Sequence, residues 1–252
     1  MRHIIPALVL WTGTATAQTT LQLPQSGGPE AAPVAAGVET SLELVLLADA
    51  NVSIDAGELA FQRQGYADAL LSDTVQDAIA DTLHGHIAVT YVEWATNQVQ
   101  VVDWMLIDWV EAAQAFADAL TAAPRATFGS NAIGAALLAG QRLIDTNAYD
   151  GFRHVIDFSG DSMGNSSGPA ILPSRDQVLA TGTVINALPI LRADDMRRAG
   201  YDLEQLYADN IIGGPGAFMV TAEGRDSFAA AVQRKLVLEI AGEVPPLRLA
   251  LD

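Results

Sequence analysis

LELVLLADANVSID, at residues 42–55, is the stretch that decides the fold. Its first seven residues are nearly all apolar, which is typical of a strand buried on both faces of a parallel sheet. Asp49, Asn51 and Ser53 follow, and these residue types are typical of turns. The stretch therefore predicts a buried strand at residues 42–48 with a polar loop at its carboxyl end.

Apolar runs and helical patterns alternate along the rest of the chain. This order predicts an α/β fold with a doubly wound, mostly parallel, Rossmann-like sheet that has helices on both faces. Residues 86–94 and 98–106 are rich in β-branched and aromatic side chains and are close enough in sequence to pair as a hairpin. The other predicted strands are at residues 151–158, 183–191 and 217–221, and the predicted helices are at residues 61–71, 75–83, 108–122, 132–145, 174–182, 203–208 and 224–241.

The composition excludes several classes of function. The 252 residues include 13 Lys and Arg against 30 Asp and Glu, a formal net charge of −17, so most of the surface repels nucleic acid and anionic lipid. The hydrophobic content of 50% is enough for a substantial core. Cysteine is absent from the sequence, so any metal must be bound by oxygen or imidazole, and a cysteine nucleophile is excluded.

The first residues have the pattern of a secretory signal peptide. A short positive start precedes an apolar run at residues 4–11, and small residues in A-x-A order end at Ala17. The apolar run is too short to span a bilayer. We expect cleavage after Ala17 and a soluble, exported protein, periplasmic or secreted, without a membrane span.

The predicted organisation is one domain between a flexible tether and a C-terminal tail. After the signal peptide at residues 1–17, residues 18–40 are rich in Thr, Gln, Pro, Gly and Ala without a period, which indicates a flexible tether. The alternation of strands and helices is unbroken at residues 41–242, and this favours a single domain. Residues 243–252 form a C-terminal tail.

Oxygen-rich loops lie where a ligand would bind. In an open α/β sheet, ligands bind beyond the carboxyl ends of the strands. Asp49, Asn51 and Ser53 occupy alternate positions after the first predicted strand, and Asn131 and Asp161 lie in two further loops. Oxygen ligands of this kind suit Mg²⁺ or Ca²⁺. The same residue types also populate turns and helix N-caps, so the spacing alone leaves both interpretations open.

The first strand and its loop resemble the metal-ion-dependent adhesion site of von Willebrand factor A domains, whose pattern is Asp-x-Ser-x-Ser after a buried strand. Further blocks make the chain similar to an uncharacterised family of exported bacterial von Willebrand A-like proteins. The resemblance implies a Rossmann-like sheet with one adhesion-type metal site at its edge, and no catalytic activity. The blocks are FQRQGYADAL at 61–70, SNAIGAAL at 130–137, VIDFSGDSMGN at 155–165, TVINALPI at 183–190, IIGGPGAFMVTA at 211–222 and DSFAAAVQRKLVLEIAG at 226–242.

The sequence departs from this metal motif at three positions. Asn51 stands where the first serine belongs, Val52 where glycine is usual, and Asn131 where a threonine would be the ligand. An amide oxygen can replace a hydroxyl toward Mg²⁺ or Ca²⁺, but Asn is longer and the site would have to shift. Both a metal-binding and a metal-free version of the fold remain open. The ligand positions that match are Asp49, Ser53 and Asp161.

A hydrolase is the alternative function. Gly160-Asp161-Ser162 is similar to the Gly-Asp-Ser block of secreted esterases, but that chemistry needs a histidine base, and no histidine follows Ser162 in the sequence. His84 and His86 have a spacing that could bind zinc from a strand, yet no third ligand is near. The alternative is therefore an esterase-like enzyme using Ser162, or a metal-activated water at Asp49 and Asp161.

Other notable side chains have structural interpretations. His154 lies within a predicted strand and is expected to be a hydrogen-bonded core residue. Trp94, Trp104 and Trp109 are expected to pack in the core, with an interaction patch as the alternative. Lys235 lies toward the end of the last predicted helix, where a positive charge suits the helix dipole.

We expect a binding protein rather than an enzyme. The predicted function is recognition of another protein through the loops at the carboxyl edge of the sheet. In the adhesion-type site that the resemblance implies, a divalent cation leaves one coordination position for a carboxylate of the partner.

Overall fold

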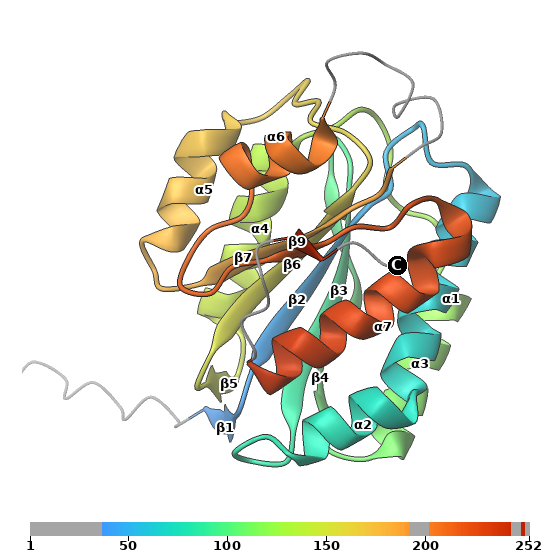
Figure 1. Ribbon diagram of the computed structural model, residues 1–252, viewed down its shortest axis with the longest axis vertical. Helices are drawn as coiled ribbons and strands as arrows, with labels where there is room; N and C mark the ends of the chain where they lie inside the picture. Colours follow the sequence, from blue (N-terminus) through green and yellow to red (C-terminus); the bar gives the residue numbers. More distant parts are fainter. Residues whose placement is uncertain (1–36, 192–201, 243–247, 250–252) are drawn as a thin grey trace, which may run out of the picture. The chain divides into compact units, whose positions relative to one another are not determined.

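The computed structural model describes residues 37–191, 202–242 and 248–249 (Figure 1). All described elements belong to one compact unit, Ala36–Asp252. The predicted signal peptide, residues 18–36 of the predicted tether and most of the predicted tail lie outside the described residues and stay predictions. None of the described helices is both long and apolar enough to cross a membrane.

Among the described residues, a seven-stranded sheet has the order β4-β3-β2-β6-β7-β8-β9 (Figure 1). Neighbouring strands are parallel except β3 and β4, which form the predicted antiparallel hairpin at one edge. The mostly parallel α/β fold class is thereby confirmed. The strands are β2 (Glu43–Asp49), β3 (Ile87–Trp94), β4 (Gln98–Ile107), β6 (His154–Gly160), β7 (Val184–Pro189), β8 (Met219–Val220) and β9 (Arg248–Leu249).

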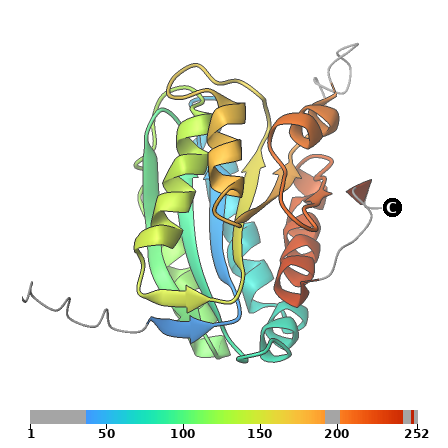
Figure 2. The same cartoon turned by 90° about the vertical axis from the view of Figure 1, so that its left-hand side faces the viewer.

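Helices cover both faces of this sheet. The helices are α1 (Ala56–Leu71), α2 (Asp73–Ala80), α3 (Val110–Ala122), α4 (Ile133–Thr146), α5 (Ile171–Leu179), α6 (Leu203–Asn210) and α7 (Arg225–Ala241). One apolar cluster packs α1, α2, α3 and α7 on one face, and a second packs α4, α5 and α6 on the other. Figure 2 shows α4 in yellow-green and α5 in gold, side by side in front of the sheet.

β2 is buried along its whole length because it lies in the middle of the sheet between both helix layers. Successive side chains of a strand point to opposite faces. Leu44 and Leu46 accordingly pack against α1 and α7, whereas Val45 and Leu47 pack in the cluster that includes α4. An unbroken apolar run is what this position requires, and the prediction from residues 42–48 is correct within one residue.

Several element boundaries differ from the prediction. α1 begins at Ala56 rather than at residue 61, because Asp55 caps it: Glu58 N donates to Asp55 Oδ1 at 2.8 Å, and Asp55 N donates to Glu58 Oε2 at 3.0 Å. The sequence did not predict β1 (Val38–Thr40) and β5 (Tyr149–Gly151), which pair in a parallel sheet of their own. β1 lies inside the predicted tether, so ordered backbone begins ahead of residue 41.

Candidate functional site

The carboxyl ends of β2 and β6 meet at one edge of the sheet. Asp49 ends β2, and Asp161 directly follows the last residue of β6, Gly160. A Cβ added at Gly160 would lie 2.8 Å from Tyr207 Oη and 3.4 Å from Asp49 Oδ2. The close contact with the Tyr207 hydroxyl requires a glycine at the end of β6, and Asp49 lies within van der Waals distance of the same point. Asp161 is buried at the same edge.

The loop after β2 folds back on its own side chains. Asn51 N donates to Asp49 Oδ1 at 2.9 Å. Ser53 donates twice to Asn51 Oδ1, from its backbone N at 2.6 Å and from its Oγ at 2.5 Å. Bonds from a side-chain oxygen to the backbone two residues on are the local preference of Asp and Asn in turns. Asn51 is therefore buried within the loop, whereas Ser53 bonds to it from an exposed position.

Asn131 joins this loop to the next one. Asn51 Nδ2 donates to Asn131 Oδ1 at 2.5 Å and to Asp49 Oδ2 at 3.2 Å. Asn131 Nδ2 in turn donates to Ser162 Oγ at 2.5 Å. The structure thus brings four of the five predicted site residues into one hydrogen-bond network, with Ser162 added. We call this network the edge cluster: Asp49, Asn51, Ser53, Asn131 and Ser162.

Arg125 fixes the backbone of the first loop. Its Nη2 donates to the carbonyl oxygens of Ala50 and Asn51, and its Nη1 donates to that of Ile54, each at 2.7 Å. Val52 N also donates to the carbonyl of Gly129, at 2.9 Å, and so ties the two loops together. No sequence motif marks Arg125, because its partners are backbone carbonyls that any residue could supply.

Two large apolar side chains lie exposed beside the edge cluster. Val52 is 75% exposed and Phe128 is 65% exposed. Both belong to the loops that the hydrogen bond between Val52 N and Gly129 O joins. Exposed apolar groups that gather in one place are a mark of interaction sites. We call Val52 and Phe128 the apolar rim.

The described histidines lie near the amino ends of the strands, whereas Ser162 lies beyond the carboxyl end of β6. His154 begins β6, and Ser162 follows its far end, so about 20 Å of strand separates them at about 3.3 Å per residue. His84 and His86 precede β3, where their rings are 5.9 Å apart and His86 Nε2 meets the carbonyl of Glu39 at 2.9 Å. None of the described histidines can be the base for Ser162.

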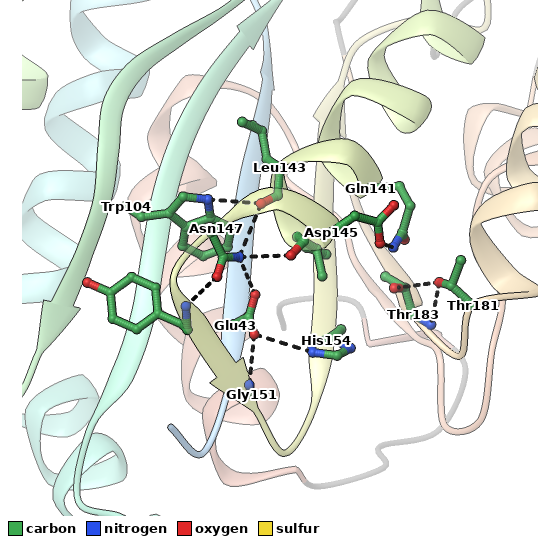
Figure 3. Close-up of polar contacts among 12 residues, drawn as sticks. Glu43, Trp104, Gln141, Leu143, Asp145, Asn147, Gly151, His154, Thr181 and Thr183 are labelled. Atoms are coloured by element: carbon green, nitrogen blue, oxygen red, sulfur yellow. Dashed lines mark hydrogen bonds and ion pairs between the residues drawn. The ribbon is translucent and has the colours of Figure 1, made fainter. Parts of the chain in front are cut away.

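A second polar cluster lies at the amino edge, around the first residue of β2 (Figure 3). Glu43 accepts a hydrogen bond from Gly151 N at 2.7 Å and one from Asn147 Nδ2 at 2.5 Å, and its Oε1 lies 3.4 Å from His154 Nε2. We call these four residues the amino-end cluster. His154 is hydrogen-bonded as expected, but its side chain is 35% exposed, so it is not a core residue.

The amino-end cluster shifts the pKa of both titratable members. Burial alone raises the pKa of Glu43, but hydrogen bonds from His154, Asn147 and Gly151 outweigh it, so the pKa is lowered. The hydrogen bond to Glu43 raises the pKa of His154 against the opposing effect of burial. The pair therefore favours a carboxylate facing an imidazolium.

Between the two edges, one face of the sheet buries a charged group. Lys235 of α7 is fully buried and lies 2.5 Å from Asp157 Oδ1 of β6, and it also donates to Glu239 Oε1. Burial, together with the charge of Asp157, raises the pKa of Glu239 to about 7 despite the opposing effect of Lys235. The sequence interpretation of Lys235 as a dipole-compensating charge was wrong, because Lys235 lies outside the last turn of α7 and its ammonium group contacts two buried carboxyl groups. We call these three residues the buried charge cluster.

The tryptophans divide between core and surface. Trp94 is fully buried and stacks on Phe158 with the ring centroids 5.0 Å apart. Trp104 is partly buried and donates its Nε1 to the carbonyl of Leu143 at 3.2 Å. Trp109 is 73% exposed at the start of α3, so the core-packing prediction was wrong for this residue.

Solved structures share this fold at low sequence identity. The pilus adhesin SpaC from Lactobacillus rhamnosus GG has 15% identity and a TM-score of 0.57, over 81% of this chain and 31% of that chain. The vWF domain of the type V pili tip protein Mfa5 from Porphyromonas gingivalis has 9% identity and a TM-score of 0.53, over 83% of this chain and 98% of that one.

A third structure, proximal thread matrix protein 1 from the mussel byssus, contains a zinc-occupied MIDAS motif. It has 17% identity and a TM-score of 0.52, over 80% of this chain and 46% of that chain. The present chain thus spans about a third of the length of SpaC and about half that of the mussel protein. At these identities the likeness establishes the fold alone.

The comparison with curated proteins gives no match. A family model described as Protein of unknown function (DUF1194) matches residues 39–244. Because this match covers most of the chain and the structural neighbours include a vWF domain, the protein belongs to the DUF1194 family and has the fold of von Willebrand factor A domains.

Proposed function

We propose that the domain binds another protein through the carboxyl edge of its sheet, by means of the edge cluster and the apolar rim. The observation that carries this proposal is the exposure of Val52 and Phe128 on two loops that are tied to each other. Exposed apolar side chains on a fixed backbone can be buried by a partner with little loss of loop entropy. The polar atoms beneath them can orient that partner.

The structural neighbours support a binding function. SpaC is a pilus adhesin, and Mfa5 is a pili tip protein. In the described part of this chain, Ser162 has no histidine within reach, and its Oγ accepts from the amide of Asn131. This arrangement orients the serine but supplies no base, so it favours recognition over hydrolysis.

The proposed binding would involve a divalent cation only if the edge cluster could bind one. Asp49, Asn51, Ser53, Asn131 and Asp161 are the residues that would bind it. No three described His, Asp or Glu side chains gather into a metal-binding group. Four of the five candidates instead engage one another through hydrogen bonds, and the proposed binding does not depend on a cation.

Export is part of the proposal. The signal-peptide pattern at residues 1–17 supports it, and so do neighbours that are pilus proteins. The mature chain should begin at Gln18 and be recovered from the periplasm or the medium. Intact-mass measurement checks this, and an exported protein that retains Met1 would contradict it.

The binding surface is tested by capture of a partner after cross-linking on the cell envelope. A Val52→Ser and Phe128→Ser double variant should lose the partner that the unmodified chain captures. Leu83→Ser is the matched control, because Leu83 is 75% exposed at the amino edge. Equal capture by the double variant, or loss on Trp109→Ser alone, would place the binding surface elsewhere.

A further inference from the structure

The resemblance to von Willebrand A domains implies a divalent cation at the position of Asn51. The question is whether the edge cluster can bind one. The orientation of the Asn51 carboxamide decides the question. Ser53 N lies 2.6 Å from one terminal atom of Asn51. A backbone N–H can only donate, so that atom must be the oxygen, Oδ1. The nitrogen, Nδ2, must therefore face the opposite way.

Nδ2 faces the two groups that a cation would be expected to join. It lies 3.2 Å from Asp49 Oδ2 and 2.5 Å from Asn131 Oδ1. An amide nitrogen carries two hydrogens, and two acceptors are present to receive them. It has no available lone pair, whereas Mg²⁺ and Ca²⁺ take oxygen ligands. A cation at this point would meet the positive ends of two N–H bonds.

Turning the Asn51 carboxamide around would not open the site. The rotation would place Nδ2 against Ser53 N, two donors facing each other, and Ser53 N would lose its acceptor. The backbone cannot shift freely to relieve this, since Arg125 binds three carbonyls of the same loop. The arrangement of donors and acceptors is therefore fixed from several sides.

Asn131 extends the same pattern to the third loop. Its Oδ1 accepts from Asn51, and its Nδ2 donates to Ser162 Oγ. Donation runs in one direction, from Ser53 through Asn51 and Asn131 to Ser162, with a branch to Asp49. Two asparagines replace the hydroxyl ligands of the family's metal motif, and together they bridge three loops through hydrogen bonds alone.

We propose that the Asn51 carboxamide takes the place of a cation in this domain and makes the carboxyl edge independent of divalent metal. This inference deepens the proposed function and rests on it for its biological meaning. Without a cation, the positive group that the described residues place beside this edge is the Arg125 guanidinium, which three backbone carbonyls already engage, and the chain carries a net charge of −17. The partner is then a protein that presents apolar side chains with neutral or basic groups beside them.

The test needs no partner. Mg²⁺, Ca²⁺ and Mn²⁺ are titrated separately into the mature chain by calorimetry, and its melting temperature is measured in chelator and in millimolar cation. The unmodified chain should show neither saturable binding nor a change in melting temperature. A ligand that binds the folded state alone would raise that temperature.

Asn51→Asp is the sharpest variant, because it exchanges only the NH₂ group for an oxygen and keeps the acceptor for Ser53 N. The new carboxylate then faces Asp49 Oδ2 across the 3.2 Å that the amide now bridges. This variant should melt several degrees lower in chelator and recover in millimolar Mg²⁺ or Ca²⁺. Asn51→Ser combined with Asn131→Thr should also gain a response to cation.

Asn97→Asp is the matched control. It makes the same change of charge in a neighbouring loop, where Asn97 Nδ2 donates to the carbonyl of Ala126 at 3.0 Å. Its melting temperature should not respond to cation.

Saturable binding of any of the three cations to the unmodified chain, lost on Asp49→Ala, would overturn the inference. So would an Asn51→Asp variant that is insensitive to both chelator and cation. If that variant does not fold, the titration of the unmodified chain decides alone. Loss of partner capture in the apolar-rim variant bears only on the proposed function, so the two failures are distinguishable.

Discussion

The two ends of β2 use the same device in different surroundings. Glu43 begins the strand and Asp49 ends it, and both carboxyl groups are buried. Each accepts one backbone N–H, from Gly151 or Asn51, and one asparagine Nδ2. Glu43 also lies beside a titratable group, His154. The comparison teaches that a buried carboxylate needs hydrogen-bond donors. When one donor is itself titratable, as His154 is, the stabilising effect of the carboxylate also depends on the protonation of that donor.

At the amino end the controlling property is pH. The lowered pKa of Glu43 makes its stabilising effect present above its ordinary range and lost as the pH falls through the folded-state value. The raised pKa of His154 makes its effect fully present below 6.5 and lost as the pH rises through the folded-state value. The pair is therefore most stabilising between the two ordinary pKa values, 4.5 for Glu43 and 6.5 for His154, and its effect declines towards the folded-state value on either side.

The largest change in the free energy of unfolding is expected in the buried charge cluster. There the donor to the buried carboxyl groups is a charged ammonium group, not an amide. Lys235→Met leaves Asp157 and Glu239 buried without their cation and should lower the free energy of unfolding by about 3–5 kcal/mol. Denaturant unfolding at neutral pH measures the loss. Arg234→Met, next on the same helix but partly exposed, is the control and should cost much less. A loss no greater than that of the control would contradict the role given to Lys235.

The second largest effect is expected at Glu239, a buried carboxyl group whose pKa is raised, whereas that of Glu43 is lowered. The pKa of Glu239 is raised from 4.5 to about 7, so the folded state binds its proton more tightly, and stability should fall as the pH rises through this range. At about 1.4 kcal/mol for each pH unit, the full effect is on the order of 3 kcal/mol. Asn186 Nδ2 of β7 donates to Glu239 Oε1 at 3.0 Å, and Glu239→Gln should flatten the pH dependence while it keeps an acceptor for this bond. Unfolding curves at a series of pH values check the slope, and an unchanged slope would sink the assignment.

The third experiment replaces the buried carboxylate at each end of β2 in turn. Glu43→Gln and Asp49→Asn each replace a carboxylate by an amide and leave one buried donor without its acceptor, so each should cost about 1–3 kcal/mol. Only Glu43→Gln should also lower the pKa of His154, since burial by itself lowers that pKa. An NMR titration of His154 in both variants distinguishes them. Equal His154 pKa values in the two variants would show that Glu43 does not control it.

The smallest effect is expected at the apolar rim. Val52 and Phe128 are largely exposed, so Val52→Ser and Phe128→Ser should each change the free energy of unfolding by less than about 0.5 kcal/mol. Thermal unfolding measures this directly. A substantial loss of stability would mean that these side chains serve the fold, and loss of partner capture could then not be assigned to the surface itself.

The fold could be predicted from the sequence because burial leaves a strong pattern. The apolar run of β2 fits only a central strand, and parallel strands carry their following loops to one edge. Asp49, Asn51, Ser53 and Asn131 could therefore be placed together before any coordinates. Which atom of Asn51 faces Asp49 could not be predicted, because a local bond from Ser53 N decides it.

Other parts of the molecule carry no sequence signal of that kind. Arg125 binds carbonyls, which every residue has, so its partners cannot be found from residue types. Lys235 and Glu239 have the spacing of an ordinary surface pair, and only the position of α7 over β6 buries them beside Asp157. Trp109 is exposed although tryptophan is usually buried, and nothing in its flanking residues indicates this.

The pairing of β2 also has a mechanical consequence. The described chain enters the domain through β1 at the amino edge, at the bottom of Figure 1, whereas the proposed binding surface lies at the carboxyl edge. A pull between the two would run along β2, which is hydrogen-bonded in parallel to β3 and β6 from Glu43 onward. Such a load shears both ladders at once and does not unzip them bond by bond. A domain that holds a partner against tension gains resistance from this arrangement without any added contact.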